Sequence, residues 1–207
     1  MSYDLGASYR AARERLSALL ADGSHAATIV PATPVWTVHD VLSHLSGVSV
    51  DAATGNMAGA PGDAWTDAQV QRGKSATDAA LIAQWAEHGP VMEGLLSSPQ
   101  GAMASAAVMD VHCHECDVLH ALGRDNTPPA EFLAWAGGAM RDRFVAQVAE
   151  AGLAPVEVTI DDYEWFRARL GRRTEAEVRS YPWSADPTPY LDLFFIFGRA
   201  ATPLGER

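Results

Sequence analysis

Residues 109–124 read MDVHCHECDVLHALGR and carry the most informative pattern in the chain. On an α-helix, residues three or four positions apart share a face, so Asp110, His114 and Asp117 line up along one stripe, which Ala121 continues. Polar groups on the inward stripe of an apolar helix are costly to bury unless a partner compensates them. A divalent cation is the partner that these side chains favour, so the stretch predicts a metal-binding helix.

A second candidate ligand lies in an earlier segment, residues 36–45, which reads WTVHDVLSHL. Here Thr37 is expected to cap a helix, with Asp40 serving the exposed amides of its first turn. Together, His44, Asp110 and His114 make the ligand set of an open zinc or non-haem iron site. Zinc is the first choice, and iron or nickel suits the same donors. Taken singly, a histidine on an apolar helix face is more often a core residue bonded to a carbonyl.

A wider pattern covers three segments: residues 36–45, residues 110–124, and residues 171–198, the last of which contains GRRT, YPWSADPTPYL and FFIFG. Taken in this order, they resemble the mycothiol-dependent maleylpyruvate isomerase family, part of the DinB-like metal-binding four-helix superfamily. In that family the first segment supplies a metal histidine, and the second supplies a carboxylate and another histidine. The matching positions here are His44, Asp110 and His114. The family's isomerase has a glutamate where Asp110 stands, so the metal would lie nearer the helix and the substrate pocket need not be the isomerase's.

The resemblance implies a thiol cofactor, mycothiol, that adds to a small electrophilic substrate. Bond rotation and thiol loss would give a cis–trans isomerase, and net transfer would give an S-transferase. Asp117 would orient His114 or a ligated water, or else make an ordinary helix hydrogen bond. Two other classes stay open: a metal-dependent hydrolase that uses metal-bound water, and a binding protein that catalyses nothing.

The concentrated positive charge of the chain lies near its third family-like segment, at Arg167, Arg169, Arg172, Arg173 and Arg179. An arginine fork suits a substrate carboxylate, and Arg173 and Arg179 are predicted to supply it because they lie within that segment. Arg72, near Gln69, is a further candidate for contact with the cofactor.

The only two cysteines, Cys113 and Cys116, form a C-x-x-C pair inside the predicted metal helix. A thioredoxin-type site would place the first thiol at a helix N-terminus, where the helix dipole activates it. This pair lies in mid-helix, so we interpret both cysteines as small buried side chains.

Composition limits the kinds of partner that the protein can bind. The chain has 207 residues, 48% of them hydrophobic, and a net charge of −11, which disfavours a nucleic-acid backbone as partner. No apolar run approaches the ~18 residues of a membrane span, and the N-terminus lacks the pattern of a secretory signal. We therefore expect a cytoplasmic protein with no nucleic-acid or membrane partner. The small thiol and the small-molecule substrate are partners that the resemblance implies, and the protein is expected to be a monomer or homodimer.

The predicted fold is mainly α: a DinB-like four-helix bundle with a small C-terminal α/β appendage. Residues 1–152 would form the metal-binding helical bundle, and residues 153–207 a small segment packed on it. Alternation in residues 156–160 predicts a short strand. The predicted helices cover residues 9–20, 37–45, 66–72, 75–96 (broken or kinked at Pro90), 102–122, 128–151, 163–170 and 174–179, whereas residues 190–197 form a helix or a buried strand.

Overall fold

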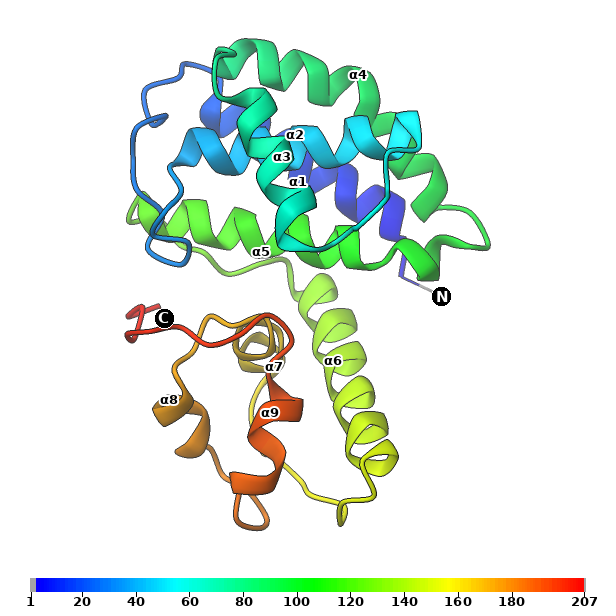
Figure 1. Ribbon diagram of the computed structural model, residues 1–207, viewed down its shortest axis with the longest axis vertical. Helices are drawn as coiled ribbons and strands as arrows, with labels where there is room; N and C mark the ends of the chain where they lie inside the picture. The colour runs from blue at the N-terminus through cyan, green and yellow to red at the C-terminus, as the bar shows by residue number, and fades with distance from the viewer. Residues whose placement is uncertain (1–2, 207) are drawn as a thin grey trace. The chain divides into compact units, whose positions relative to one another are not determined.

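The computed structural model describes residues 3–206 and is mainly helical, as the sequence predicts (Figure 1). Within these residues there are nine α-helices and two 3₁₀ helices but no strand. Two isolated bridges, Ile29 with Thr37 and Val158 with Trp183, are the β pairings of the described chain. No helix in this part of the chain is both long and apolar enough to cross a membrane. The chain divides into two compact units between Asn126 and Thr127.

The N-terminal unit contains four long helices, one shorter helix and one 3₁₀ turn. They are α1 (Leu5–Leu20), α2 (Val38–Thr54), α3 (Asp63–Gly73), α4 (Asp78–Leu96), η1 (Gly101–Ala104) and α5 (Ala106–Ala121). α4 packs against α1 and α2, α5 packs against α1 and α2, and α3 lies on α2. Pro90 does not break α4, which runs through it. The two helices that carry the predicted ligands, α2 and α5, therefore belong to one packed unit.

The start of α2 and the end of α5 follow from local sequence, whereas α5 begins at Ala106 and not at residue 102 as predicted, because residues 101–104 form the separate 3₁₀ turn η1. Thr37 and Asp40 form a capping box at the start of α2, with the Thr37 hydroxyl accepting from the Asp40 amide and the Asp40 carboxylate accepting from the Thr37 amide. After α5, Gly123 adopts φ +64, a conformation that favours glycine. Both ends lie where the sequence predicts them, so the registers of His44 and Asp110 are set by short-range chemistry.

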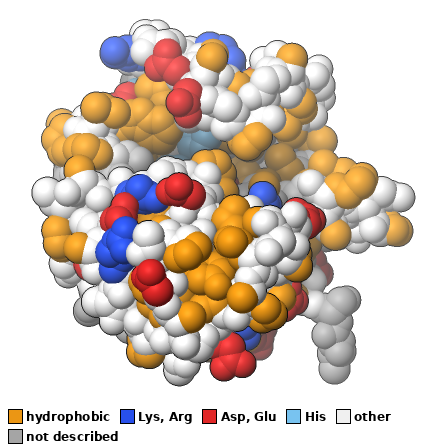
Figure 2. Space-filling view, turned by 60° about the horizontal axis from the view of Figure 1, so that its bottom comes forward, with side chains coloured by type: hydrophobic (Ala, Val, Ile, Leu, Met, Phe, Trp, Pro, Cys, Tyr) orange, Lys and Arg blue, Asp and Glu red, His pale blue; other side chains and the backbone are white. Residues whose placement is uncertain are grey.

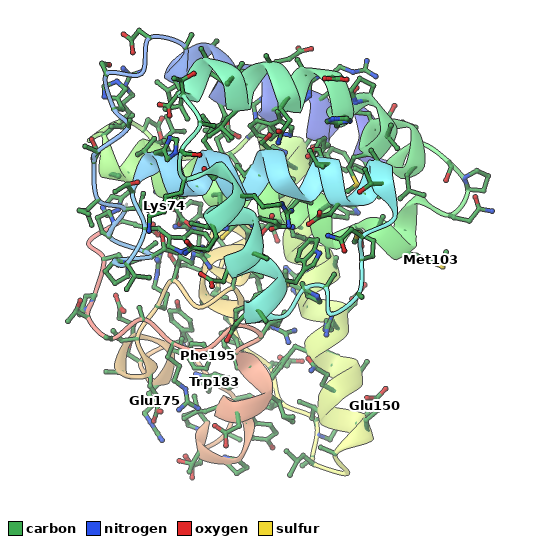
Figure 3. All side chains as sticks on the ribbon, turned by 45° about the horizontal axis from the view of Figure 1, so that its top comes forward. Lys74, Met103, Glu150, Glu175, Trp183 and Phe195 are labelled. Atoms are coloured by element: carbon green, nitrogen blue, oxygen red, sulfur yellow. The ribbon has the colours of Figure 1, made fainter. Side chains whose placement is uncertain are left out.

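The C-terminal unit is built around one long helix. Its elements are α6 (Ala130–Glu150), α7 (Asp162–Arg169), α8 (Glu175–Arg179), η2 (Thr188–Tyr190) and α9 (Leu191–Phe194). The sequence analysis placed α6 in the bundle, with a boundary after residue 152, whereas the structure places α6 in the C-terminal unit. The reason is aromatic packing, since Phe144 on α6 lies 5.8 Å from Trp165 and 5.5 Å from Phe194 between ring centroids. Trp183 packs against the same cluster beside α9 (Figure 3).

The predicted strand at residues 156–160 is wrong, so the C-terminal unit is not α/β within the described residues. Val158 makes one bridge to Trp183, and the Thr159 amide donates to the Pro182 carbonyl over 3.1 Å. Pro182 has no amide hydrogen to return, so a ladder cannot extend through it. Residues 190–197 do not form a single helix or a strand. α9 ends at Phe194, and the chain after it is irregular.

Candidate metal centre

The three predicted ligands come together in the N-terminal unit. His44 on α2 and Asp110 and His114 on α5 each offer a ligand atom, and these atoms all lie within 4.8 Å of one another. The two histidine side chains are only 5% and 8% exposed, whereas that of Asp110 is 35% exposed. A buried nitrogen pair with a partly exposed carboxylate leaves one side of the site open to a further ligand.

The spacing of the donors suits one small cation. His44 Nε2 lies 3.2 Å from Asp110 Oδ2, and His114 Nε2 lies 3.5 Å from Asp110 Oδ1. Ligand atoms held about 2.1 Å from one Zn²⁺ at tetrahedral or octahedral angles are about 3.0–3.4 Å apart. The two histidine–carboxylate separations are close to this spacing, while the three ligand atoms together span up to 4.8 Å and would have to draw closer around an ion.

Both ring nitrogens of each histidine face an oxygen. His44 has Gln69 Oε1 2.7 Å from Nδ1 and Asp110 Oδ2 near Nε2. His114 has Asp117 Oδ2 3.2 Å from Nδ1, within ion-pair distance although outside hydrogen-bond geometry, and Asp110 Oδ1 near Nε2. A neutral imidazole carries one N–H and can serve one such oxygen. If both rings were protonated, two buried imidazolium groups would lie 5.2 Å apart between ring centroids and repel each other. A divalent cation bound to both Nε2 atoms would satisfy Asp110 and both rings without this repulsion.

Burial opposes protonation of His44, but Asp110 and Gln69 outweigh it and raise the pKa of His44 above its ordinary value. This direction shows that the surroundings of the ring favour positive charge at this point. A metal cation bound at Nε2 would benefit from the same electrostatic field that favours a proton there.

A chain of polar contacts supports His44 from behind. Gln69 on α3 accepts from His44 and donates through Nε2 to Asp51 Oδ2 over 2.8 Å. Asn56 and Arg72 also donate to Asp51, over 2.9 and 2.8 Å. Although burial acts the other way, these hydrogen bonds lower the pKa of Asp51, so its carboxyl is ionised and can only accept.

Asp117 and Trp36 complete the surroundings of the site. The Asp117 side chain is fully buried beside His114 Nδ1, where the carboxylate can orient the imidazole as a supporting group. The ring of Trp36 lies 5.4 Å from that of His44 and 5.8 Å from that of His114 between centroids. The indole ring of Trp36 therefore packs beside both histidine rings, tilted by 44° and 32° to them.

Arg72, predicted to contact a cofactor, donates to both carboxylate oxygens of Asp51 in this network. Its side chain is still 46% exposed. Arg72 thus lies two hydrogen-bonding residues away from His44, and a direct contact with a cofactor stays a prediction.

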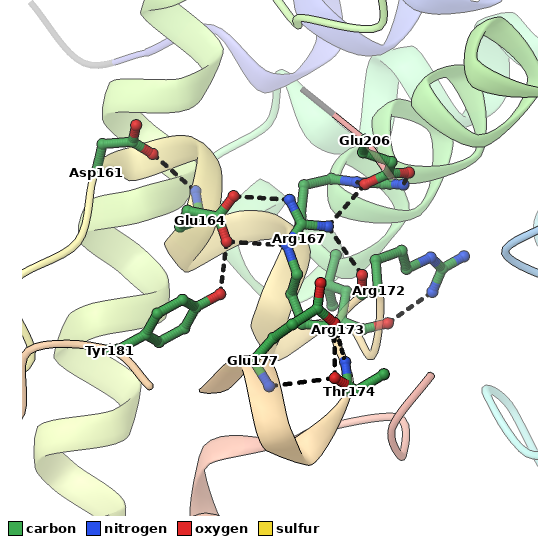
Figure 4. A network of polar contacts seen from close by, with 10 residues as sticks. Asp161, Glu164, Arg167, Arg172, Arg173, Thr174, Glu177, Tyr181 and Glu206 are labelled. Atoms are coloured by element: carbon green, nitrogen blue, oxygen red, sulfur yellow. Dashed lines mark hydrogen bonds and ion pairs between the residues drawn. The ribbon is translucent and has the colours of Figure 1, made fainter. Parts of the chain in front are cut away.

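Arg173 and Arg179 belong to the C-terminal unit, where the structure provides each with internal partners. Arg173 donates to Glu164 over 2.7 Å and to Glu206 over 2.9 Å, in the network of Figure 4. Arg179, on the surface, pairs with Glu175 over 2.7 Å. These partners show that the guanidinium group of Arg173 serves packing within its own unit. A contact of either arginine with a substrate stays a prediction.

The arginine cluster is not an exposed basic surface. The side chain of Arg167 is fully buried, and Arg169 donates to the carbonyls of Phe194 and Met140 over 2.9 and 2.5 Å. On the face drawn in Figure 2, basic side chains lie beside acidic ones rather than in a patch of their own. The concentration of arginines in sequence therefore reflects internal ion pairing more than a binding surface.

The other histidines near the site have local partners. His112 Nε2 lies 2.9 Å from the Ser8 hydroxyl, and burial lowers the pKa of His112. His39 Nδ1 lies 2.5 Å from Asp78 Oδ1. Neither residue belongs to the cluster that could hold a metal among residues 3–206.

Cys113 and Cys116 are both buried and form no disulfide, as expected for small core side chains. Replacing both by alanine should leave the metal content per chain unchanged, because neither thiol is a member of the ligand cluster. Elemental analysis of the purified double variant checks this. A folded variant that loses its metal would contradict it.

Sequence reasoning noticed Gln69 only as a neighbour of Arg72 and gave Asp51 no role. A signal for both was present. His44 and Asp51 are seven residues apart and share a face of α2, while Gln69 and Arg72 are three apart and share a face of α3. What the spacing could not show is that these two faces meet.

No family model matches the chain, and comparisons with curated proteins and with solved structures give no significant match either. Membership of the isomerase family therefore stays a prediction, which rests on the resemblance of the three segments.

Proposed function

We propose that the protein is a divalent-metal-dependent enzyme that uses a low-molecular-weight thiol, mycothiol, on a small electrophilic substrate, as an S-transferase or a cis–trans isomerase. The observation that carries the proposal is the convergence of His44, Asp110 and His114 within 4.8 Å on two packed helices. Zinc is the metal we expect first, and iron or nickel would fit the same donors.

A divalent cation held in such a site lowers the pKa of a coordinated thiol, which supplies a strong nucleophile near neutral pH. The residues of the chain hold and shape this centre. Asp117 orients His114, Gln69 orients His44, and the Trp36 ring packs beside both histidine rings. The partly exposed Asp110 marks the side from which a thiol and an electrophile can approach.

The proposed fold assignment follows the same reasoning. α1, α2, α4 and α5 are taken as a DinB-like bundle, with ligands projecting from α2 and α5 as in that superfamily. The thiol and the reaction type rest on the resemblance. Arg173 or Arg179 is proposed to bind a substrate carboxylate, and Arg72 to contact the cofactor.

The proposal is tested by measuring turnover on zinc-loaded protein, with and without mycothiol. The substrates are a panel of thiol-reactive electrophiles that includes cis-configured unsaturated acids. We expect turnover that needs both the metal and the thiol. Hydrolysis of activated esters that needs the metal but not the thiol would overturn the thiol assignment in favour of a hydrolase. Full metal occupancy with no turnover of any kind would favour a binding protein.

A further inference from the structure

Gln69 bridges two residues of α2 that lie on one face of that helix. His44, Gly47 and Asp51 follow one another at spacings of three and four, so they form a stripe that α3 covers. Gln69 reaches from α3 across this stripe, with Oε1 2.7 Å from His44 Nδ1 and Nε2 2.8 Å from Asp51 Oδ2. One amide thus connects a proposed metal ligand to a buried carboxylate.

The orientation of this amide follows from its partners. Asp51 is ionised and only accepts hydrogen bonds, so the NH₂ end of Gln69 has to face it. The carbonyl end then faces His44 Nδ1, which must carry the proton. In the neutral ring the remaining nitrogen, Nε2, then keeps its lone pair and points to Asp110 and the centre of the site. Asp51 therefore dictates, through Gln69, which nitrogen of His44 can bind a cation.

The helix packing is shaped to allow this bridge. A Cβ atom at Gly47 would lie 2.7 Å from Gln69 Cβ and 2.8 Å from its Cγ, so only glycine lets the stem of Gln69 lie against α2. At the end of α3, a Cβ at Gly73 would lie 2.5 Å from Ser43 Cβ. Two glycines, one on each helix, bring the helix axes close enough for the amide to reach both partners.

We propose that Gln69, oriented by Asp51, is a positioning residue that holds His44 in the Nδ1–H tautomer with Nε2 directed at the metal. The inference rests on the proposed metal centre for its purpose. The tautomer itself is a property of the metal-free chain and can be measured independently.

The first test reads the tautomer by ¹⁵N NMR of the imidazole nitrogens in metal-free protein, at a pH above the titration of His44 followed in the same spectra. Wild-type His44 should carry its proton on Nδ1. Gln69→Met, which keeps the shape of the side chain, should move the proton to Nε2, where Asp110 accepts it. Asp51→Asn should do the same, because Gln69 can then turn its NH₂ group toward His44. A Gln69→Met variant in which the proton stays on Nδ1 would overturn the proposal.

The second test measures the affinity for Zn²⁺ by competition with a chromogenic chelator. Loss of a group that orients a histidine ligand costs 10–100-fold in metal affinity, so we expect about that loss for Gln69→Met and Asp51→Asn. The double variant Asp51→Asn/Gln69→Glu should recover most of the affinity. In it the amide introduced on α2 donates to the carboxylate introduced on α3, which again accepts from His44 Nδ1–H. Failure of the double variant to recover either affinity or tautomer would count against a positioning role.

Gln84→Met is the matched control, because Gln84 also donates to α2, to the Ser46 hydroxyl over 2.9 Å, without touching His44. This variant should keep the wild-type tautomer of His44 and the wild-type affinity for Zn²⁺. An equal loss of affinity in it would show that the effect of Gln69→Met comes from disturbed helix packing and not from the orientation of His44. If wild-type protein binds no zinc while the tautomer still responds to Gln69→Met, the positioning device stands and the proposed metal function fails.

Discussion

Replacing Glu206 by alanine is expected to destabilise the C-terminal unit by about 3–5 kcal/mol, the cost of removing one member of a buried ion pair. The Glu206 side chain is fully buried, pairs with the buried guanidinium of Arg167, and accepts from Arg173 over 2.9 Å (Figure 4). Without this carboxylate, Arg167 loses its ion pair with Glu206 in the interior. Arg173 keeps Glu164, so Arg167 carries most of the loss.

Amide hydrogen exchange of peptides covering residues 162–180, read by mass spectrometry, measures this local stability. Glu175→Ala is the matched control, since Glu175 also pairs with two arginines, Arg179 and Arg199, but at the surface with its side chain 35% exposed. Exposed pairs contribute about 0–1 kcal/mol, so the control should exchange almost as wild type does. Equal protection in the two variants would show that the buried cluster does not hold the unit together.

Replacing His114 by alanine is expected to abolish the predicted stoichiometric metal binding and, with it, the proposed metal-dependent activity. His114 supplies one of the three donors of the cluster, and two remaining donors on different helices form a weak site. A ligand that binds only the folded protein stabilises it by about 2.7 kcal/mol at a concentration 100 times its dissociation constant. Zinc at that concentration should therefore raise the melting temperature of the wild type and leave that of the variant unchanged.

His120→Ala is the control for this experiment, because His120 lies on the same helix and is not a member of the cluster. It should keep one metal per chain by elemental analysis and keep the zinc-dependent rise in melting temperature. If His114→Ala still holds a full equivalent of metal, His114 is not a ligand.

The sequence by itself determined the helices and the order of polar groups along them. Asp110 and His114 share a face because one helical turn separates them, and this geometry is local. The Thr37–Asp40 capping box and the turn at Gly123 are equally local, and both were predicted where the structure has them. Local pattern also suggested a strand at residues 156–160, which failed because the partner segment holds Pro182 and offers no continuous ladder.

Tertiary structure decided what these helices meet. His44 and Asp110 are 66 positions apart in the sequence. His44 joins Asp110 and His114 only because α2 and α5 pack together. The same is true of Gln69, whose bridge to His44 depends on the close contact of α3 with α2 at Gly47. Packing also placed α6 in the C-terminal unit, and it paired Arg173 with Glu164 and Glu206. Periodicity shows which face of a helix is buried. Which other helix packs against that face depends on the packing of the whole chain.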